Sequence, residues 1–160
     1  MNEINNTTDD NLVKPEIQFI RVYTKDLSFE APNTPEVFKA KWAPELKLEI
    51  EISATPLPEE AFYEVVLHLT THVTNENKPA FVIDVKQAAI FKITNVAPEN
   101  LEQILKIFCP YTIYPYARET VSDLVNRGNF PQLLLVPINF EAMFEQEKAR
   151  QAQNTTTTVQ

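Results

Sequence analysis

Two histidines four residues apart are the first candidates for chemistry in this chain. On a helix, His68 and His72 would share a face and could hold one metal ion. The segment 62–74 that contains them alternates apolar and polar residues, which predicts a strand. On a strand the two side chains point the same way but lie about 13 Å apart, too far to share one ion. We therefore expect two polar-face residues and no metal site.

The other reactive groups do not converge either. Cys109 is the single cysteine and has no base near it in the sequence, so we expect a small buried apolar residue. Strand alternation spreads the carboxylates along a face and so does not pair them for acid–base work. Gly128 is the only glycine, whereas phosphate-binding loops need several. The sequence predicts no catalytic residue and no cofactor, and therefore no enzyme.

Composition narrows the class of protein further. A chain of 160 residues that is 44% hydrophobic has enough apolar residues for one core. Its 22 acidic and 14 basic residues give a formal charge of −8, which repels nucleic acid and attracts basic partners. The sequence shows neither a signal peptide nor an apolar run long enough for a bilayer. We predict a cytoplasmic protein with one domain over 14–150, between disordered segments at 1–13 and 151–160.

Four segments have patterns of apolar residues that are typical of β-strands. The clearest is 45–53, where Leu46, Leu48 and Ile50 alternate with charged residues. A long proline-bearing crossover at 29–44 precedes it, and a tight turn is expected at 75–78. The predicted strands are 16–24, 45–53, 62–74 and 80–93.

The second half of the chain has helical periodicity interrupted by prolines. A helix is predicted to start at Pro98 and to end at Pro110, and a second helix to start at Pro115. Gly128 is expected in the left-handed position after that helix, and Asn139 is expected to cap a last helix. Strands followed by helices indicate an α+β fold, a four-stranded antiparallel sheet with helices packed on one face.

Several long motifs resemble one known family. In the right order, and over residues 17–144, the chain is similar to the SecB-type protein-export chaperones of bacteria. The runs that carry the resemblance are VYTKDLSFEAPNTPEVF at 22–38, YEVVL at 63–67, QAAIF at 87–91 and CPYTIYPYARE…RGNFPQLLLVPINF within 109–140. Where the family often has two glycines before Ile-Phe, this chain has Ala88 and Ala89.

The resemblance implies a chaperone that works without ATP. Such a holdase binds unfolded precursor proteins and delivers them to SecA, the motor of the Sec translocase. It implies a homotetramer, a dimer of dimers in which first strands pair between subunits and long helices pack between dimers. The family binds the zinc-bearing tail of SecA, and the zinc belongs to SecA. The matching positions in this sequence are Asp26, Glu30, Val82 and Asp84.

A surface for unfolded clients is predicted from exposed apolar residues of the crossover, the second strand and the last helix. Core packing is the alternative role for each of them. Two other classes of function stay open. One is a SecB-like chaperone of a toxin–antitoxin pair, against which the positions matched to SecA binding argue. The other is a small-molecule-binding domain. The predicted client-binding residues are Trp42, Leu46, Leu48, Phe140, Met143 and Phe144.

Overall fold

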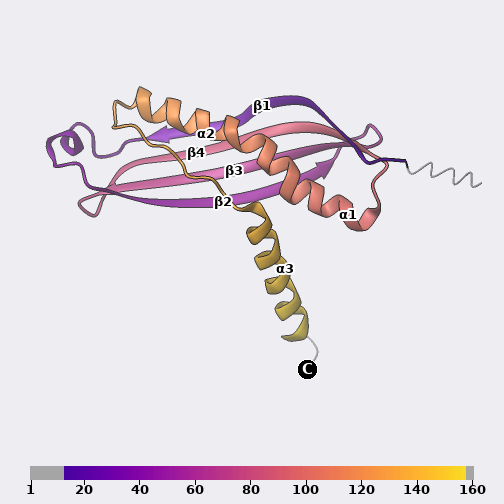
Figure 1. Cartoon of the computed structure of the whole chain (residues 1–160). Coiled ribbons are helices and arrows are strands. Elements are labelled where there is room, and N and C mark those ends of the chain that lie inside the picture. Colours follow the sequence, from indigo (N-terminus) through magenta and orange to yellow (C-terminus); the bar gives the residue numbers. More distant parts are fainter. Residues whose placement is uncertain (1–12, 158–160) are drawn as a thin grey trace, which may run out of the picture.

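The computed structural model describes residues 13–157. Four long strands form one sheet, and helices follow them in the chain (Figure 1). All neighbouring strands are antiparallel, and their order in the sheet is β1-β4-β3-β2. The predicted fold class is confirmed, although each strand is longer than its apolar pattern indicated. The strands are β1 (Glu16–Glu30), β2 (Pro44–Pro56), β3 (Phe62–Asn75) and β4 (Lys78–Thr94).

The hairpin between β3 and β4 fixes the register of the sheet. Glu76 and Asn77 both have positive φ, 53° and 61°, as a two-residue turn that matches strand twist requires. The predicted turn at 75–78 is therefore confirmed. Strand β1 is less regular, because its register shifts between Phe19 and Arg21 and again between Thr24 and Asp26. These bulges bend an edge strand that extends six residues beyond the predicted end at residue 24.

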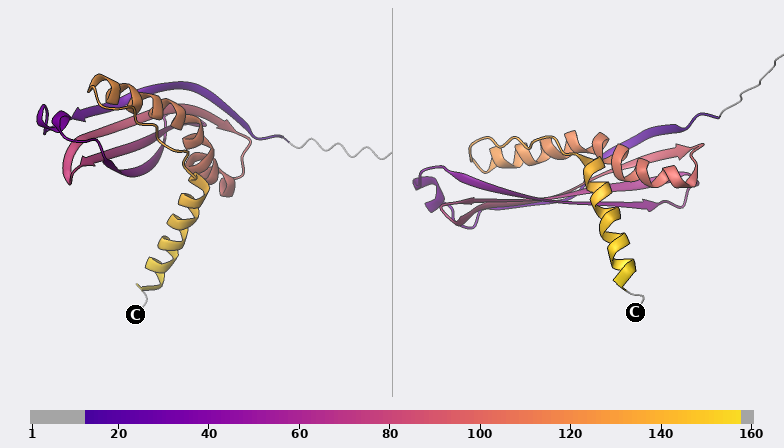
Figure 2. Two further views of the ribbon diagram at one scale, coloured as in Figure 1. Left: turned by 60° about the vertical axis from the view of Figure 1, so that its left-hand side comes forward. Right: turned by 60° about the horizontal axis from the view of Figure 1, so that its bottom comes forward.

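The helices cover one face of the sheet and leave the other open (Figure 2). They are α1 (Pro98–Gln103), a π-helical turn η2 (Ile104–Phe108) and α2 (Cys109–Arg127). On the covered face, alternate residues of β3 such as Val65, Leu67 and Leu69 are fully buried. They form one core with four residues of α2 that are also fully buried. These residues recur every four positions, so they lie on one face of the helix: Ile113, Ala117, Val121 and Val125.

The prolines of the helical region do not interrupt it, so the predicted break between Pro110 and Pro115 is wrong. Helical structure runs from residue 98 to 127, and Pro115 lies inside α2. Pro110 directly follows the π-helical turn, where the backbone bonding shifts to i→i−5, as in the bond from the N–H of Cys109 to the carbonyl of Ile104. A proline in a helix interior costs about 3 kcal/mol, which burial of two or three core side chains offsets. Tertiary packing therefore outweighs local preference here.

Gly128 is needed for space, and the predicted left-handed conformation is wrong. Its φ is −74°, and the next residue, Asn129, takes the positive φ of 59°. A Cβ on Gly128 would overlap Cζ of Phe29, so a side chain there would require the Phe29 ring to move. The glycine thus lets the end of α2 approach β1 closely.

The last helix, α3 (Phe140–Thr157), starts as predicted and ends later than predicted. Asn139 caps it, since its side-chain oxygen accepts from the backbone N–H of Ala142 at 3.0 Å. The helix continues through residues 151–157, which corrects the predicted disorder in that part of the tail. Alanine and glutamine are good helix formers, and Gln151 donates to Glu147 one turn earlier. The helix projects from the body of the molecule (Figure 1).

Three further sequence expectations concern the chain ends and membranes. The structure does not describe residues 1–12 and 158–160. They hold most of the predicted disordered N-terminus and the end of the predicted disordered tail. Within 13–157, no helix has the length and apolar character needed to span a bilayer.

Candidate partner-binding and client-binding surfaces

The open face of the sheet brings together the four residues that the family resemblance assigned to SecA. Strand pairing sets Glu30 opposite Val82 and Asp26 opposite Lys86 across β1 and β4. Asp84 lies between those two pairs, opposite Ser28. Asp26 and Glu30 are exposed, and Val82 is half-buried among the carboxylates. We call Asp26, Glu30, Val82 and Asp84 the acidic patch.

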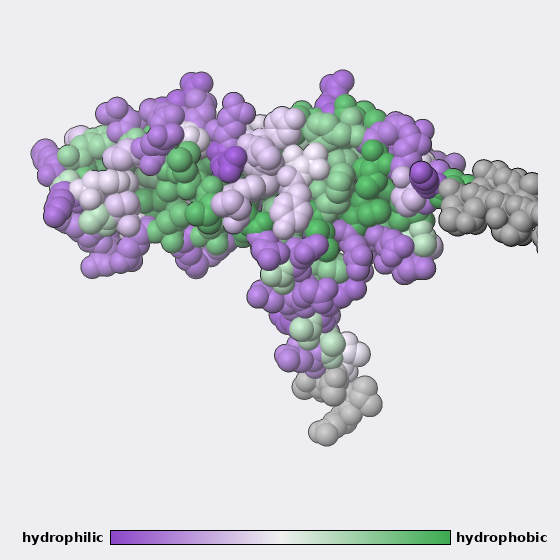
Figure 3. Space-filling model, viewed as in Figure 1, coloured by the Kyte–Doolittle hydropathy of each residue, from purple (hydrophilic) through white to green (hydrophobic). Residues whose placement is uncertain are grey.

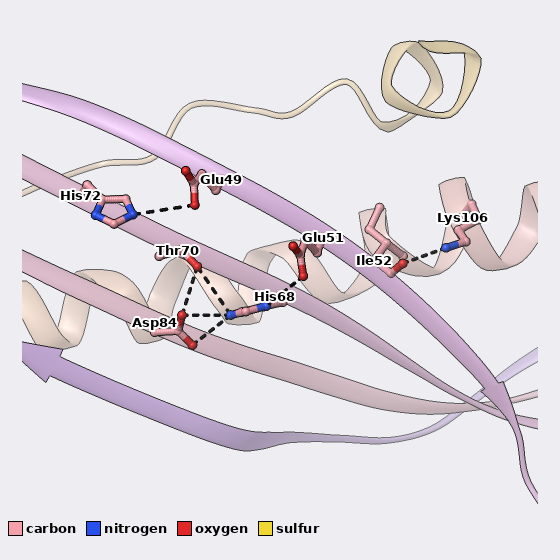
Figure 4. Close-up of polar contacts among 8 residues, drawn as sticks. All are labelled: Glu49, Glu51, Ile52, His68, Thr70, His72, Asp84 and Lys106. Carbon is pink, nitrogen blue, oxygen red and sulfur yellow. Dashed lines mark hydrogen bonds and ion pairs between the residues drawn. The ribbon is translucent and has the colours of Figure 1, made fainter. Parts of the chain in front are cut away.

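The carboxylate of Asp84 is held in place from the neighbouring strand. Nε2 of His68 lies 2.9 Å from Oδ1 and 3.0 Å from Oδ2 of Asp84. Thr70 donates its hydroxyl to Oδ2 at 3.0 Å (Figure 4). Partial burial raises the pKa of Asp84, but the bonds from His68 and Thr70 outweigh it and hold that pKa below its usual value. The acidic patch therefore carries an ionised, oriented carboxylate at neutral pH.

The two histidines bind carboxylates on β2 and do not face each other. Nδ1 of His68 lies 3.4 Å from Oε2 of Glu51, and Nε2 of His72 lies 3.8 Å from Oε2 of Glu49. Figure 4 shows each ring directed at its own carboxylate. In the part of the chain that the structure describes, no three His, Cys, Asp or Glu side chains are arranged to hold a metal ion.

Cys109 lies at the start of α2 in the core. Its side chain is fully buried, and burial raises the pKa of the thiol to about 12. The thiol stays protonated at neutral pH and is a poor nucleophile there. Its role in the structure is packing.

The predicted client-binding residues differ in exposure, and three of them lie in two apolar places: Met143 and Phe144 in one, Trp42 in the other. Phe140 is fully buried, and its ring packs edge-on against Tyr111 and Tyr114 at centroid distances of 4.9 and 6.0 Å. Phe144 is also buried, at 4% exposure, whereas Leu46 is 46% exposed. Trp42, Leu48 and Met143 are half-buried.

One of these places is a hollow between β2 and α3, with a volume of about 320 Å³. Ile50 and Ile52 line it from the strand, and Met143 and Phe144 line it from the helix. Lys106, on the π-helical turn, reaches the free edge of β2 and donates to the carbonyl of Ile52 at 2.7 Å (Figure 4).

The other place is an aromatic cluster below the crossover, and its central residue was not predicted from the sequence. The ring of Phe130 lies between four others, at centroid distances of 4.7 Å from Phe81, 5.1 Å from Phe38, 5.8 Å from Trp42 and 6.3 Å from Phe29. Phe38 is 48% exposed. The sequence signal was present, since the only glycine precedes Phe130 by two residues and allows the close approach.

Exposed apolar side chains also follow the free edge of β1. Phe19, Ile20 and Leu27 are 42%, 47% and 46% exposed. Phe19 stacks on Tyr116 of α2 at 6.2 Å, and Tyr116 is itself 41% exposed. Apolar areas are visible on the surface of the body, whereas the projecting part of α3 is mostly hydrophilic (Figure 3).

Comparisons with known proteins agree on one family. Residues 10–151 match the family model described as "Preprotein translocase subunit SecB". The "Protein-export protein SecB" of Legionella pneumophila, in strains Corby and Lens, is 48% identical over 149 residues, which cover 92% of this chain and 90% of the relative.

Among solved structures, the chain is similar to a SecB-like chaperone of Mycobacterium tuberculosis, solved with a peptide from the HigA1 antitoxin. The TM-score is 0.65 at 20% identity, over 77% of this chain and 91% of that one, and this likeness shows the fold. The family match and the identity to the curated relatives show more than the fold. The chain belongs to the SecB family of protein-export chaperones.

Proposed function

We propose that this protein is a cytoplasmic, ATP-independent chaperone that binds unfolded precursor proteins and delivers them to SecA for export through the Sec translocase. The observation that carries the proposal is the 48% identity to export chaperones over 149 residues. The geometry of the acidic patch supports it, because residues from two sequence motifs meet on one open face.

The acidic patch is the proposed docking site for the zinc-bearing tail of SecA. Exposed carboxylates on a chain with a formal charge of −8 attract a basic segment and speed its encounter. Val82 supplies an apolar contact between the charges. Binding is expected to weaken with added salt, since exposed charges are screened over about 10 Å at 0.1 M ionic strength.

The proposed assembly is a homotetramer, a dimer of dimers. Strand β1 is an edge strand with exposed Phe19, Ile20 and Leu27, so an equivalent strand of a second copy would bury them. In this arrangement α2 packs between dimers. Several client surfaces on one tetramer then add avidity, because the second contact is intramolecular.

The two apolar places are the proposed client-binding surfaces, reached through their exposed members. Phe38 is accessible, and Trp42 is half-buried, and both rings contact Phe130. Weak apolar contacts of this kind tolerate many client sequences. Among the described residues, the buried polar side chains Thr71, Asn75 and Gln87 are spread over two strands, so they form no convergent small-molecule site.

Trp42 provides a direct test, because it is the only tryptophan of the chain. We expect an unfolded, tryptophan-free precursor to shift the emission of Trp42 to shorter wavelength, since a bound client excludes water from the indole. Fluorescence and size-exclusion chromatography are measured on the same mixture, without nucleotide. The folded form of the same precursor is the control and leaves the emission unchanged.

Two outcomes count against parts of the proposal. A complex on the column with unchanged emission contradicts a client surface at Trp42. The absence of any complex with unfolded precursors contradicts the chaperone function itself.

A further inference from the structure

His68 occupies a bridging position on the open face. Its Nε2 contacts both oxygens of Asp84 on β4, at 2.9 and 3.0 Å, and its Nδ1 lies 3.4 Å from Glu51 on β2. The side chain is 24% exposed, which is less than its two partners at 33% and 82%. A single ring from β3 therefore joins carboxylates on both neighbouring strands (Figure 4).

The protonation state of this ring decides what the face presents to a partner. A neutral imidazole has one N–H and donates to one of the two carboxylates, whereas an imidazolium donates to both. Taking up a proton also reduces the combined charge of Glu51, His68 and Asp84 from two negative charges to one.

Polar and charged groups face His68 from its own strand and from both neighbouring strands. Glu51 approaches from β2, Thr70 lies beside it on β3, and Asp84 and Lys86 face it from β4. Lys25 of β1 lines the same shallow hollow, but its ammonium binds Glu64 at 2.7 Å. The two carboxylates are thus the charged groups in direct contact with the ring.

His72 lies on the same face in a much looser setting. Its nearest carboxylate is 3.8 Å away on Glu49, and its side chain is 40% exposed. It lies opposite Val82 in the pairing of β3 with β4, but among the described residues its side chain makes no ion pair or hydrogen bond with a carboxylate of the acidic patch. This difference makes it a matched control on the same strand.

We propose that His68 is a positioning residue of the docking surface, which holds the carboxylate of Asp84 in place and couples partner binding to the release of a proton. The inference rests on the proposed docking of a basic segment at the acidic patch. A basic side chain that approaches Asp84 competes with the charged form of His68 for the same carboxylate. By linkage, the bound state then holds fewer protons, and docking weakens as the pH falls.

The proton coupling is tested by calorimetric titration of the full-length protein with SecA near pH 6.5, in two buffers of different ionisation enthalpy. The difference in heat gives the number of protons released. We expect the wild type to release more protons than His68→Gln, and His72→Gln to release as many as the wild type. Between pH 8 and pH 6, the affinity of the wild type is expected to fall about three- to tenfold more than that of His68→Gln.

The positioning role is tested separately at pH 8, where the proton plays little part. Glutamine retains an N–H that donates to Asp84, so His68→Gln is expected to bind SecA like the wild type. His68→Ala leaves Asp84 without this donor and is expected to bind about three- to tenfold more weakly. Circular dichroism checks that both variants are folded.

The two experiments test different parts of the proposal. Equal proton release by the wild type and His68→Gln overturns the coupling, and equal binding by His68→Ala and the wild type at pH 8 overturns the positioning role. If the wild type does not bind SecA at all, the docking proposal fails and this inference fails with it.

Discussion

Replacement of both Asp26 and Glu30 by lysine is expected to weaken SecA binding at least about 100-fold, which is about 2.7 kcal/mol. The double substitution replaces two attractive carboxylates of the acidic patch by two charges that repel a basic segment. Both side chains are exposed and make no ion pair with a described residue, so the fold does not depend on them. Capture of unfolded precursor is expected to stay intact.

The control reverses the same amount of charge elsewhere. Glu59 and Glu60 are exposed in the connection from β2 to β3. This connection lies at the opposite end of the sheet from Glu30, as the strand pairing shows. Their double replacement by lysine is expected to change SecA affinity by less than about threefold at 0.15 M salt. Loss of client capture or of the tetramer in the Asp26/Glu30 variant would show that these residues have a structural role instead.

Phe140→Ala is expected to lower the free energy of unfolding by about 3–5 kcal/mol. The ring is fully buried between Tyr111 and Tyr114 at the start of α3, and its removal leaves a cavity that the surrounding aromatic rings cannot close. Denaturant unfolding followed by circular dichroism measures the change at constant protein concentration. The same substitution at Phe38, whose side chain is 48% exposed, is the control and is expected to cost about 1 kcal/mol.

This prediction separates two roles for Phe140. The sequence assigned the residue to the client surface, whereas its burial assigns it to the core. If Phe140→Ala weakened client capture without lowering the free energy of unfolding, the client role would hold and the core role would be contradicted.

The strands were predictable because alternation is a local property of the sequence. In 45–53 and 62–74 every second side chain faces the core, and the structure places Val65, Leu67 and Leu69 there. The helical region was predicted less well, because the path of the chain through Pro110 and Pro115 depends on packing against the sheet. Gly128 was misassigned for a similar reason, since its need for space arises from Phe29, a residue almost 100 positions away in the chain.

The proximity of the site residues depends on the order of the strands in the sheet, which no local sequence pattern encodes. The motif resemblance named the residues of the acidic patch, but only the register of β1 with β4 brings Glu30 beside Val82. The contacts of His68 require β2 and β4 on either side of β3. From spacing alone, His68 and His72 were predicted to be polar-face residues, and their carboxylate partners could not be identified.

The central claim is that this protein binds unfolded precursors without ATP. The refolding rate of a slow-folding precursor tests it most directly. The precursor is diluted from denaturant into buffer with or without the purified protein, and no nucleotide is added. The account predicts that refolding slows as the concentration of the protein rises, and that adding ATP changes nothing. A refolding rate that is unaffected by a molar excess of the protein, or slowed only in the presence of ATP, would contradict it.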